Sequence, residues 1–204
     1  KDYVIASDTD SIYLHMGDLV EAVYKGREAT TEGIVSFLNK VCEVELEPYI
    51  ESSYQELAEY VNAYDQKMIM KRENIADRGI WTAKKRYILN VWDSEGVRYE
   101  EAKLKIMGIE AIKTSTPAPC RKMLKDAFKI LMSGTEEECI EYIERCRKEF
   151  KSLPPEEVSF PRTASNVEKW FSSADLYGKG CPIHIRGAIL YNHWTKKKDL
   201  THKY

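Results

Sequence analysis

The stretch "YVIASDTDSIYLH", residues 3–15, places two aspartates one residue apart between two β-forming runs. The runs on either side are rich in β-branched and aromatic side chains, which favour strands. The centre, residues 7–10, is polar and typical of a turn. The stretch therefore predicts a hairpin with Asp8 and Asp10 at its tip. Their carboxylates serve either the turn or a chemical reaction.

The bulk composition is that of an ordinary globular protein, with 43% hydrophobic and 31% charged residues in a chain of 204. This length allows one large domain or two small ones around a buried core. No apolar run approaches the roughly 18 residues of a membrane span. No signal peptide precedes the first strand, so we expect a cytoplasmic protein without membrane contact. Because the chain opens directly in a strand and without Met, we expect a fragment of a longer protein.

Charge is distributed unevenly along the chain. Residues 1–66 hold 4 Lys or Arg against 14 Asp or Glu, residues 67–107 hold 10 against 6, and residues 108–204 hold 17 against 13. An acidic start before a basic remainder suits a metal-binding end beside an anion-binding surface. It equally suits two independent solvated faces, so charge alone does not decide between them.

The first half of the chain reads as helices followed by strands. A short helix is expected at residues 17–25, and a long helical periodicity covers residues 31–64, where Pro48 should kink or divide it. Residues 67–107 alternate apolar with charged side chains and predict three or four antiparallel strands, with a hairpin turn at residues 93–96. Together with the opening hairpin these strands can make one sheet that carries the long helices on one face.

The second half, from Gly108 onward, is mainly helical. Thr116 before Pro117 predicts a helix start, and Thr135 with Glu138 predicts a capping box for the next helix. Residues 151–163 read as a loop, and shorter helices follow. The fold class is therefore α+β, with an antiparallel sheet and packed helices in residues 1–107 and a mainly helical domain in residues 108–204.

The two aspartates have a structural and a chemical interpretation. A D-x-D turn is most often structural, because Asp bonds nearby backbone N–H groups, and this one is too sparse for a calcium loop. In a strand, however, residues i and i+2 face the same side, and two carboxylates held together favour a bound cation. Mg²⁺ takes few protein carboxylates and completes its shell with water and phosphate oxygens. Asp8 and Asp10 are thus candidate ligands for metal-assisted phosphoryl transfer.

A second unusual string is "WTAKKRYILNVW", residues 81–92, in which three consecutive cations interrupt a strand-like pattern. One interpretation is a solvated strand edge protected by lysines. The other is a strand that lays Lys84, Lys85 and Arg86 against a phosphate backbone, with Tyr87 adding a packed hydroxyl.

The two motifs together resemble a known family. Asp8-Thr9-Asp10-Ser11 resembles the D-T-D-S signature of family B DNA polymerases, and Lys84-Lys85-Arg86-Tyr87, about 75 residues later, resembles their K-K-R-Y element. The strings "MKRENIA", "YILNVWDSEG", "KLKIMGIEAIKTSTP" and "CPIHIRGAILYN" are similar to the T4-type bacteriophage replicative polymerases. The resemblance covers nearly the whole chain. It implies the C-terminal portion of a palm domain in residues 1–107 and part of a thumb domain in residues 108–204.

The resemblance also implies roles for individual residues. Asp10 takes the role of the firm ligand of two catalytic Mg²⁺ ions, and Asp8 that of a supporting carboxylate, in a two-metal site that this chain supplies only in part. In the family, the K-K-R-Y element lies along the DNA near the primer end, a carboxylate lies near the primer terminus, and the palm–thumb junction touches the duplex backbone. The corresponding residues here are Lys84, Lys85, Arg86, Tyr87, Glu73, Lys113, Thr114 and Ser115.

The implied function is that of a DNA-directed DNA polymerase fragment, which extends a primer from dNTPs. Its partners would be primer–template DNA, dNTP and the remaining polymerase segments: the upstream palm, the fingers and the exonuclease. A sliding clamp would bind only through a C-terminal segment outside this sequence, and the location would be a host cell's cytoplasm. Another metal-binding Asp lies upstream in the family, so we expect the chain alone to be inactive. The alternative is a standalone duplex-DNA-binding module whose acidic hairpin is only a turn.

Overall fold

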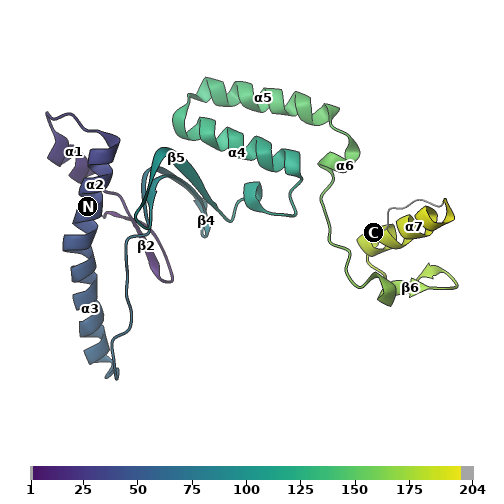
Figure 1. Cartoon of the computed structure of the whole chain (residues 1–204), viewed down its shortest axis with the longest axis horizontal. Helices are drawn as coiled ribbons and strands as arrows, with labels where there is room; N and C mark the ends of the chain where they lie inside the picture. Colours follow the sequence, from purple (N-terminus) through teal and green to yellow (C-terminus); the bar gives the residue numbers. More distant parts are fainter. Residues whose placement is uncertain (1, 199–204) are drawn as a thin grey trace.

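The computed structural model describes residues 2–198 and has the mixed α+β composition that the sequence predicts, with antiparallel sheets and packed helices (Figure 1). Three separate sheets occur in the described part of the chain, in the strand orders β1-β2, β3-β4-β5 and β6-β7. No helix among the described residues is both long and apolar enough to cross a membrane.

The opening hairpin forms as expected but does not join the larger sheet. Strand β1 (Val4–Asp8) pairs antiparallel with β2 (Ser11–Leu14) through partners from Val4 and Leu14 to Asp8 and Ser11. The prediction that these strands share one sheet with residues 67–107 is therefore wrong for the described residues. The hairpin instead lies against that sheet through side chains, chiefly those around Tyr13.

The larger sheet contains three strands, β3 (Asn74–Ala83), β4 (Arg86–Ser94) and β5 (Val97–Met107), and Figure 1 shows that it is strongly curved. The turn from β4 to β5 is Glu95-Gly96, with φ of 52° and 86°. Two consecutive positive φ angles are the geometry of a type I′ hairpin, which the sequence around Gly96 indicates. The predicted turn is confirmed, and β4 becomes the central strand.

The acidic first part forms helices beside this sheet. Helix α1 (Gly17–Tyr24) is followed by α2 (Thr31–Val41), a π-helical segment η1 (Cys42–Leu46) and α3 (Glu47–Tyr60). The division near Pro48 is confirmed, but it takes the form of a wider turn, in which Glu47 N–H reaches the carbonyl of Cys42. Proline has no N–H to donate, so it disturbs the regular ladder of the preceding turn.

The two faces of the central strand β4 are buried against different partners. Tyr87, Leu89 and Val91 form a cluster with Tyr13 of the hairpin. Ile88 points to the other side and packs with residues of the segment after β5 and of helix α4, namely Ile109, Phe128 and Met132. The alternation of side chains along a strand thus assigns the hairpin to one face of the sheet and α4 to the other.

A buried carboxylate joins the sheet to the consecutive helices α2 and α3. Asp93 at the end of β4 is 1% exposed and accepts hydrogen bonds from Arg72, Arg98 and the N–H of Gly96. Burial alone raises the pKa of Asp93, but the hydrogen bonds from the two arginines bring it below its ordinary value. Arg72 also donates hydrogen bonds to the side chain of Asn39 in α2. Through Arg72, the ionised carboxylate of Asp93 therefore holds α2 against the sheet.

The helical segment after β5 contains η2 (Glu110–Ile112), α4 (Ala118–Ser133), α5 (Glu136–Ser152) and α6 (Pro155–Val158). The capping box of Thr135 and Glu138 is confirmed at the start of α5. Thr116 does not cap α4, because Pro117 occupies that position and no side chain caps it. The loop predicted for residues 151–163 contains the last turn of α5 and the short α6, so it is more regular than expected.

The last part of the described chain has its own small core. It contains η3 (Val167–Trp170), the hairpin of β6 (Phe171–Ser172) and β7 (Leu176–Tyr177), and α7 (Ile183–Lys197). Cys181, Ile185 and Ile189 form its buried centre. The helices at its two ends agree with the sequence, whereas the short hairpin between them was not expected. Figure 1 shows this unit apart from α4 and α5, beyond an extended segment that follows α6.

We expect Asp93→Asn to lower the free energy of unfolding at pH 7 by about 3 kcal/mol, because it leaves the cations of Arg72 and Arg98 without a buried counter-charge. Urea unfolding, followed by circular dichroism, measures this change in the free energy of unfolding. The matched control is Asp65→Asn, which removes an exposed carboxylate 3.8 Å from Lys67 and should cost about 1 kcal/mol or less.

The pH dependence of this effect has a defined sign. The pKa of Asp93 is lowered in the folded state, so its ionisation stabilises the fold above the ordinary carboxylate pKa. That stability is lost as the pH falls through the lowered folded-state pKa. The difference between wild type and Asp93→Asn should therefore narrow below about pH 4. A difference that stays constant down to pH 2 would contradict the structural role assigned to the carboxylate.

Candidate metal and nucleic-acid site

The acidic tip of the hairpin is a tight two-residue turn. Asp8 pairs with Ser11 across the strands, and Thr9 and Asp10 form the loop, with Thr9 in the left-handed region at φ 54°. The N–H of Asp10 donates to the carbonyl of Asp8 over 2.6 Å, and the Ser11 hydroxyl donates to the same carbonyl over 3.1 Å. A β-branched residue at positive φ is strained, which is frequent at functional turns. Asp10 is exposed, and it lies in the turn rather than in a strand, so strand alternation does not orient it.

The basic string forms a second tip rather than part of a strand. Lys84 and Lys85 are the turn between β3 and β4, and Lys85 adopts a φ of 60°. The expectation of a continuous basic strand is therefore wrong for these two residues, while Arg86 and Tyr87 begin β4. Both lysines are exposed, as a phosphate-binding role requires.

These two tips meet in space. Lys85 Nζ lies 3.6 Å from Asp8 Oδ1, with the two side chains 64% and 32% exposed. An exposed ion pair of this kind contributes little to stability. The ion pair is informative about geometry, because it shows that the acidic turn and the basic turn are neighbours although 75 residues separate Asp8 from Lys84 in the sequence. The sequence supplied the two motifs, and the structure supplies the contact between them.

An aromatic cluster beneath the tips fixes their relative position. The Tyr13 ring lies 5.4 Å from the ring of Trp81 and 5.4 Å from the ring of Tyr87, edge to face in both cases. Burial raises the pKa of Tyr13 to about 12, and the hydrogen bond with Tyr87 adds to the rise. Tyr87 is only 8% exposed. It therefore acts here as a packing residue that holds the hairpin on the sheet.

Glu110 connects two of the sequence-predicted cations. Arg86 donates to Glu110 Oε2 over 2.6 Å, and Lys113 donates to Oε1 over 2.9 Å. The hydrogen bonds from Lys113 and Arg86 lower the pKa of Glu110 to about 2. The sequence motifs indicate DNA contacts for both cations but give no role to Glu110, whose only signal is its place three residues before Lys113. In this structure the carboxylate ties the start of β4 to the segment after β5.

Three further candidate residues lie outside this group of contacts. Glu73 directly precedes β3, at the end of the strand opposite the lysine turn, and its Oε2 lies 3.3 Å from Lys105 Nζ. Thr114 and Ser115 lie in an exposed turn between η2 and α4. Within residues 2–198, no hydrogen bond or ion pair joins any of the three to the acidic hairpin or to the lysine turn.

A glycine allows the segment after β5 to approach the lysine turn closely. Gly108 has a φ of 67°, and a Cβ atom built on it would lie 2.2 Å from the carbonyl oxygen of Lys85. No side chain fits at that distance. The backbone at Gly108 therefore supports the turn that presents Lys85 to Asp8, which gives this junction a positioning role.

The chemistry of the donors is compatible with Mg²⁺, but the set is incomplete. Asp8 and Asp10 offer carboxylate oxygens, which are the ligands that this ion prefers. Among the described residues, no group of three or more His, Cys, Asp or Glu side chains is arranged to hold a metal ion. The hairpin can thus contribute part of a metal site, and further ligands would have to come from elsewhere.

Comparison with known proteins shows similarity to two phage polymerases. The chain is 39% identical over 202 residues to the DNA-directed DNA polymerase of Escherichia phage RB69, and 34% identical over 199 residues to that of Enterobacteria phage T4. These matches cover 95% and 94% of the chain but only 22% of each relative. The chain is thus homologous to these polymerases and spans about a fifth of their length. No family model matches it.

The contact at Gly108 gives a prediction with a matched control. We expect Gly108→Ala to destabilise the fold by well over the 1–2 kcal/mol of a left-handed alanine, because the new methyl group overlaps the Lys85 carbonyl. Gly26→Ala has a similar φ of 74° but nothing within 4 Å, so it should show the conformational cost alone. Thermal unfolding of both variants measures the difference. Equal destabilisation by the two would mean that the close approach at Gly108 does not support the turn.

Proposed function

We propose that this chain is part of a DNA-directed DNA polymerase of family B, and that it carries part of the nucleotidyl-transfer site together with a surface for the primer–template. The observation that carries the proposal is the ion pair between Asp8 and Lys85, which brings the D-T-D-S turn to the K-K-R-Y turn. The similarity to phage DNA-directed DNA polymerases over nearly the whole chain supports it.

In this proposal, residues 1–107 are the C-terminal portion of the palm and residues 108–204 are part of the thumb. The change from sheet to helices near Gly108 supports such a boundary. The ion pair between Arg86 and Glu110 then joins the two domains across this boundary, because Glu110 belongs to the thumb and Arg86 to the palm. Lys113, Thr114 and Ser115 would contact the duplex backbone from this junction.

The residues of the two tips have distinct roles in the proposed site. Asp10 and Asp8 would hold Mg²⁺, which when bound activates the primer 3′-hydroxyl and neutralises charge on the pyrophosphate leaving group. Lys85 balances the negative charge of Asp8, and Lys84 is exposed for a phosphate of the primer strand. Tyr87 holds the hairpin in place from below through Tyr13.

The chain would need other parts to act. Two carboxylates do not make a two-metal site, so we propose that the upstream palm supplies a further ligand and that the fingers hold the dNTP. The exonuclease, and a sliding clamp bound through a C-terminal segment, would belong to the same enzyme, which would work in the cytoplasm of a host cell. Glu73 would lie toward the primer terminus. The chain alone would bind primer–template DNA without extending it.

One observation favours a second function. Asp8 already has a cationic partner in Lys85, and the backbone around it is bonded within the turn. A carboxylate that serves only the turn would leave a standalone duplex-DNA-binding module, in which the lysine tip binds phosphates and no metal is involved. Loss of the Asp10 carboxylate distinguishes the two functions, because it should abolish primer extension by a polymerase but leave duplex binding by a standalone module unchanged.

The test is primer extension by a chimaera in which this chain replaces the matched segment of the phage RB69 polymerase. We expect Asp10→Asn to lower the extension rate at least about a hundredfold while leaving primer–template affinity unchanged, because the carboxylate acts on the metal and not on the DNA backbone. Asp65→Asn removes an exposed carboxylate elsewhere and should leave both unchanged. An inactive unmutated chimaera, or equal activity of the two variants, would contradict the proposal.

A second experiment tests the proposed DNA-binding surface at the lysine turn. Lys84→Ala with Lys85→Ala should weaken duplex binding for all sequences alike and flatten the slope of affinity against salt by about one unit per lost phosphate contact. The control replaces Lys25 and Lys40, two exposed lysines on the acidic side of the molecule, by Ala. An equal change in the control would show that general charge, rather than the lysine turn, binds the DNA.

A further inference from the structure

Glu110 is an exposed carboxylate that binds two cations. Arg86 Nη2 donates to its Oε2 over 2.6 Å, and Lys113 Nζ donates to its Oε1 over 2.9 Å. The side chains of Arg86, Glu110 and Lys113 are 38%, 46% and 43% exposed. Each carboxylate oxygen thus takes one cation, and all three groups remain open to solvent. We call these three residues the junction cluster.

The junction cluster carries an excess of positive charge at the surface. Hydrogen bonds from Lys113 and Arg86 lower the pKa of Glu110 to about 2, so its carboxylate is ionised at neutral pH. Two cations around one carboxylate leave one net positive charge. Asp93 also pairs with two cations, but it is only 1% exposed and belongs to the core. The junction cluster differs because a ligand can reach it.

Both cations of the cluster keep donors for a further partner. The guanidinium of Arg86 uses Nη2 for Glu110, and the ammonium of Lys113 uses one of its three N–H groups. Within residues 2–198, no other hydrogen bond or ion pair engages either head group. Phosphate oxygens accept hydrogen bonds from guanidinium and ammonium groups alike. The cluster can therefore take an anion without releasing Glu110.

The cations are held in place before any ligand arrives. A Cβ atom built on Gly108 would lie 3.2 Å from Arg86 Cγ, so the stem of Arg86 lies against the segment that carries Glu110. Glu110 then fixes the head group of Arg86 and that of Lys113. A side chain that is ordered before binding loses less conformational entropy on binding. The carboxylate therefore prepares the two cations for a ligand.

The cluster lies at the end of the sheet that carries the lysine turn. Arg86 follows Lys85 directly and begins β4. Side chains alternate along a strand, so Arg86 lies on the side of Ile88 and α4, whereas Tyr87 faces the acidic hairpin. An anion bound by the cluster is therefore a different group from a phosphate bound on the hairpin side of the turn.

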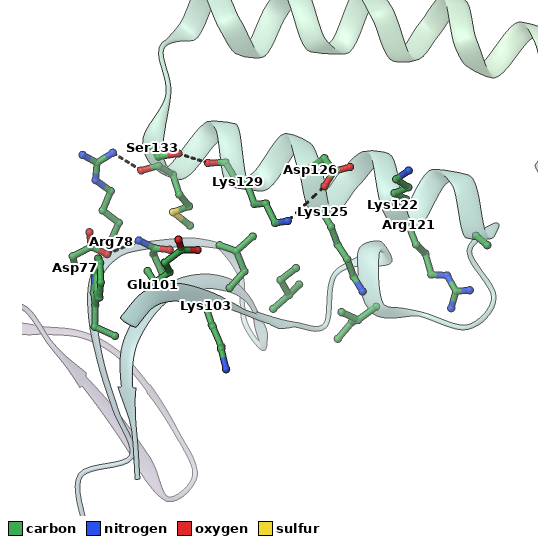
Figure 2. A pocket seen from close by; sticks show the side chains of 18 residues that line it. Asp77, Arg78, Glu101, Lys103, Arg121, Lys122, Lys125, Asp126, Lys129 and Ser133 are labelled. Carbon is green, nitrogen blue, oxygen red and sulfur yellow. Dashed lines mark hydrogen bonds and ion pairs between the residues drawn. The ribbon is translucent and has the colours of Figure 1, made fainter. Parts of the chain in front are cut away.

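The groove between the sheet and α4 does not indicate a ligand in the same way (Figure 2). Asp77 lies beside Arg78 at one end of the groove, and Asp126 lies near Lys129 on α4. Cations and carboxylates are thus mixed along its walls. The junction cluster, in contrast, joins two cations to one carboxylate at hydrogen-bond distance.

We propose that Glu110 is a positioning residue, which holds Arg86 and Lys113 as a clamp for one backbone phosphate of duplex DNA. The clamp rests on the proposed function, because it requires a chain that binds primer–template DNA. It adds that both cations contact the same phosphate. It also adds that a carboxylate, which repels DNA through its own charge, raises the affinity by orienting its two partners.

The test compares the primer–template affinity of the chain with that of Glu110→Gln. Fluorescence anisotropy measures it at about 0.15 M salt, where the screening length is about 8 Å. Loss of a negative charge alone should tighten DNA binding, whereas loss of the positioning role should weaken it. We expect Glu110→Gln to bind at least about threefold more weakly, because two long side chains must then be ordered on binding.

The matched control is Glu144→Gln, at an exposed carboxylate that pairs with Arg147 on α5. It removes the same charge from an ion pair outside the clamp. Its primer–template affinity should equal that of the wild type or slightly exceed it.

A second measurement locates the clamp on the DNA. Neutral methylphosphonates replace the phosphates of the duplex one at a time. The clamped phosphate is the position at which this change weakens binding by the wild type but has less effect on Arg86→Ala and on Lys113→Ala. We expect Glu110→Gln to lose sensitivity at that same position and to keep it elsewhere. Because each variant is compared with itself along the DNA, partial misfolding does not imitate this pattern.

Three results would overturn the clamp: equal or tighter binding by Glu110→Gln, different phosphates for Arg86→Ala and Lys113→Ala, or a change in Glu110→Gln that is spread evenly over all phosphates. In each of them the duplex still binds, so the proposed function stands. A wild-type chain that binds no duplex would contradict the proposed function itself, and the clamp with it.

Discussion

The packing of Tyr13 between Trp81 and Tyr87 determines where the acidic hairpin lies. The hairpin shares no backbone ladder with the three-stranded sheet, so side-chain contacts alone set its position. Edge-to-face aromatic pairs are directional and contribute about 0.5–1.5 kcal/mol each beyond their buried area. The ion pair between Asp8 and Lys85 then adds orientation at the tip. The buried carboxylate of Asp93 joins this sheet to α2 through Arg72, and the close approach at Gly108 supports the lysine turn, so both contribute to the frame that carries the site.

Local signals in the sequence predicted the local structure well. The Glu95-Gly96 turn, the capping box at Thr135 and the division of the long helix near Pro48 each rest on residues within one turn of each other, and each is present. The lysine turn was missed, because Lys85 at positive φ carries none of the Gly or Asn signal that usually marks such a turn. A run of alternating residues therefore looked like one strand.

Long-range arrangement was harder to predict. The sequence indicated strands but not that they divide into separate sheets, because strand pairing depends on contacts between distant segments. Asp93 looked like an ordinary turn residue, and only the structure shows it buried between Arg72 and Arg98. The candidate site was predicted as two motifs. Their contact, and the pairing of Arg86 and Lys113 with Glu110, join segments that are distant in the sequence or carry no motif, so only the folded structure reveals them.

The sheet separates two surfaces of different character. One face carries the aromatic cluster and, above it, the acidic and basic tips. The other face packs against α4 and leaves a groove of about 1370 Å³ lined by both cations and carboxylates. Because both faces share the central strand β4, a change that bends this strand would affect both. The segment from Gly108 to Lys113 touches the lysine turn and leads into α4, so it connects the two surfaces mechanically.

The central claim is that the acidic turn and the lysine turn form one site. Titration of the isotope-labelled chain with Mn²⁺, followed by paramagnetic broadening of backbone amide signals, tests it most directly. The account predicts that the amides of residues 8–11 and of residues 84–86 broaden together, while those of the distant Glu95-Gly96 turn stay sharp. Broadening of residues 8–11 without residues 84–86, or no selective broadening at either turn, would contradict it.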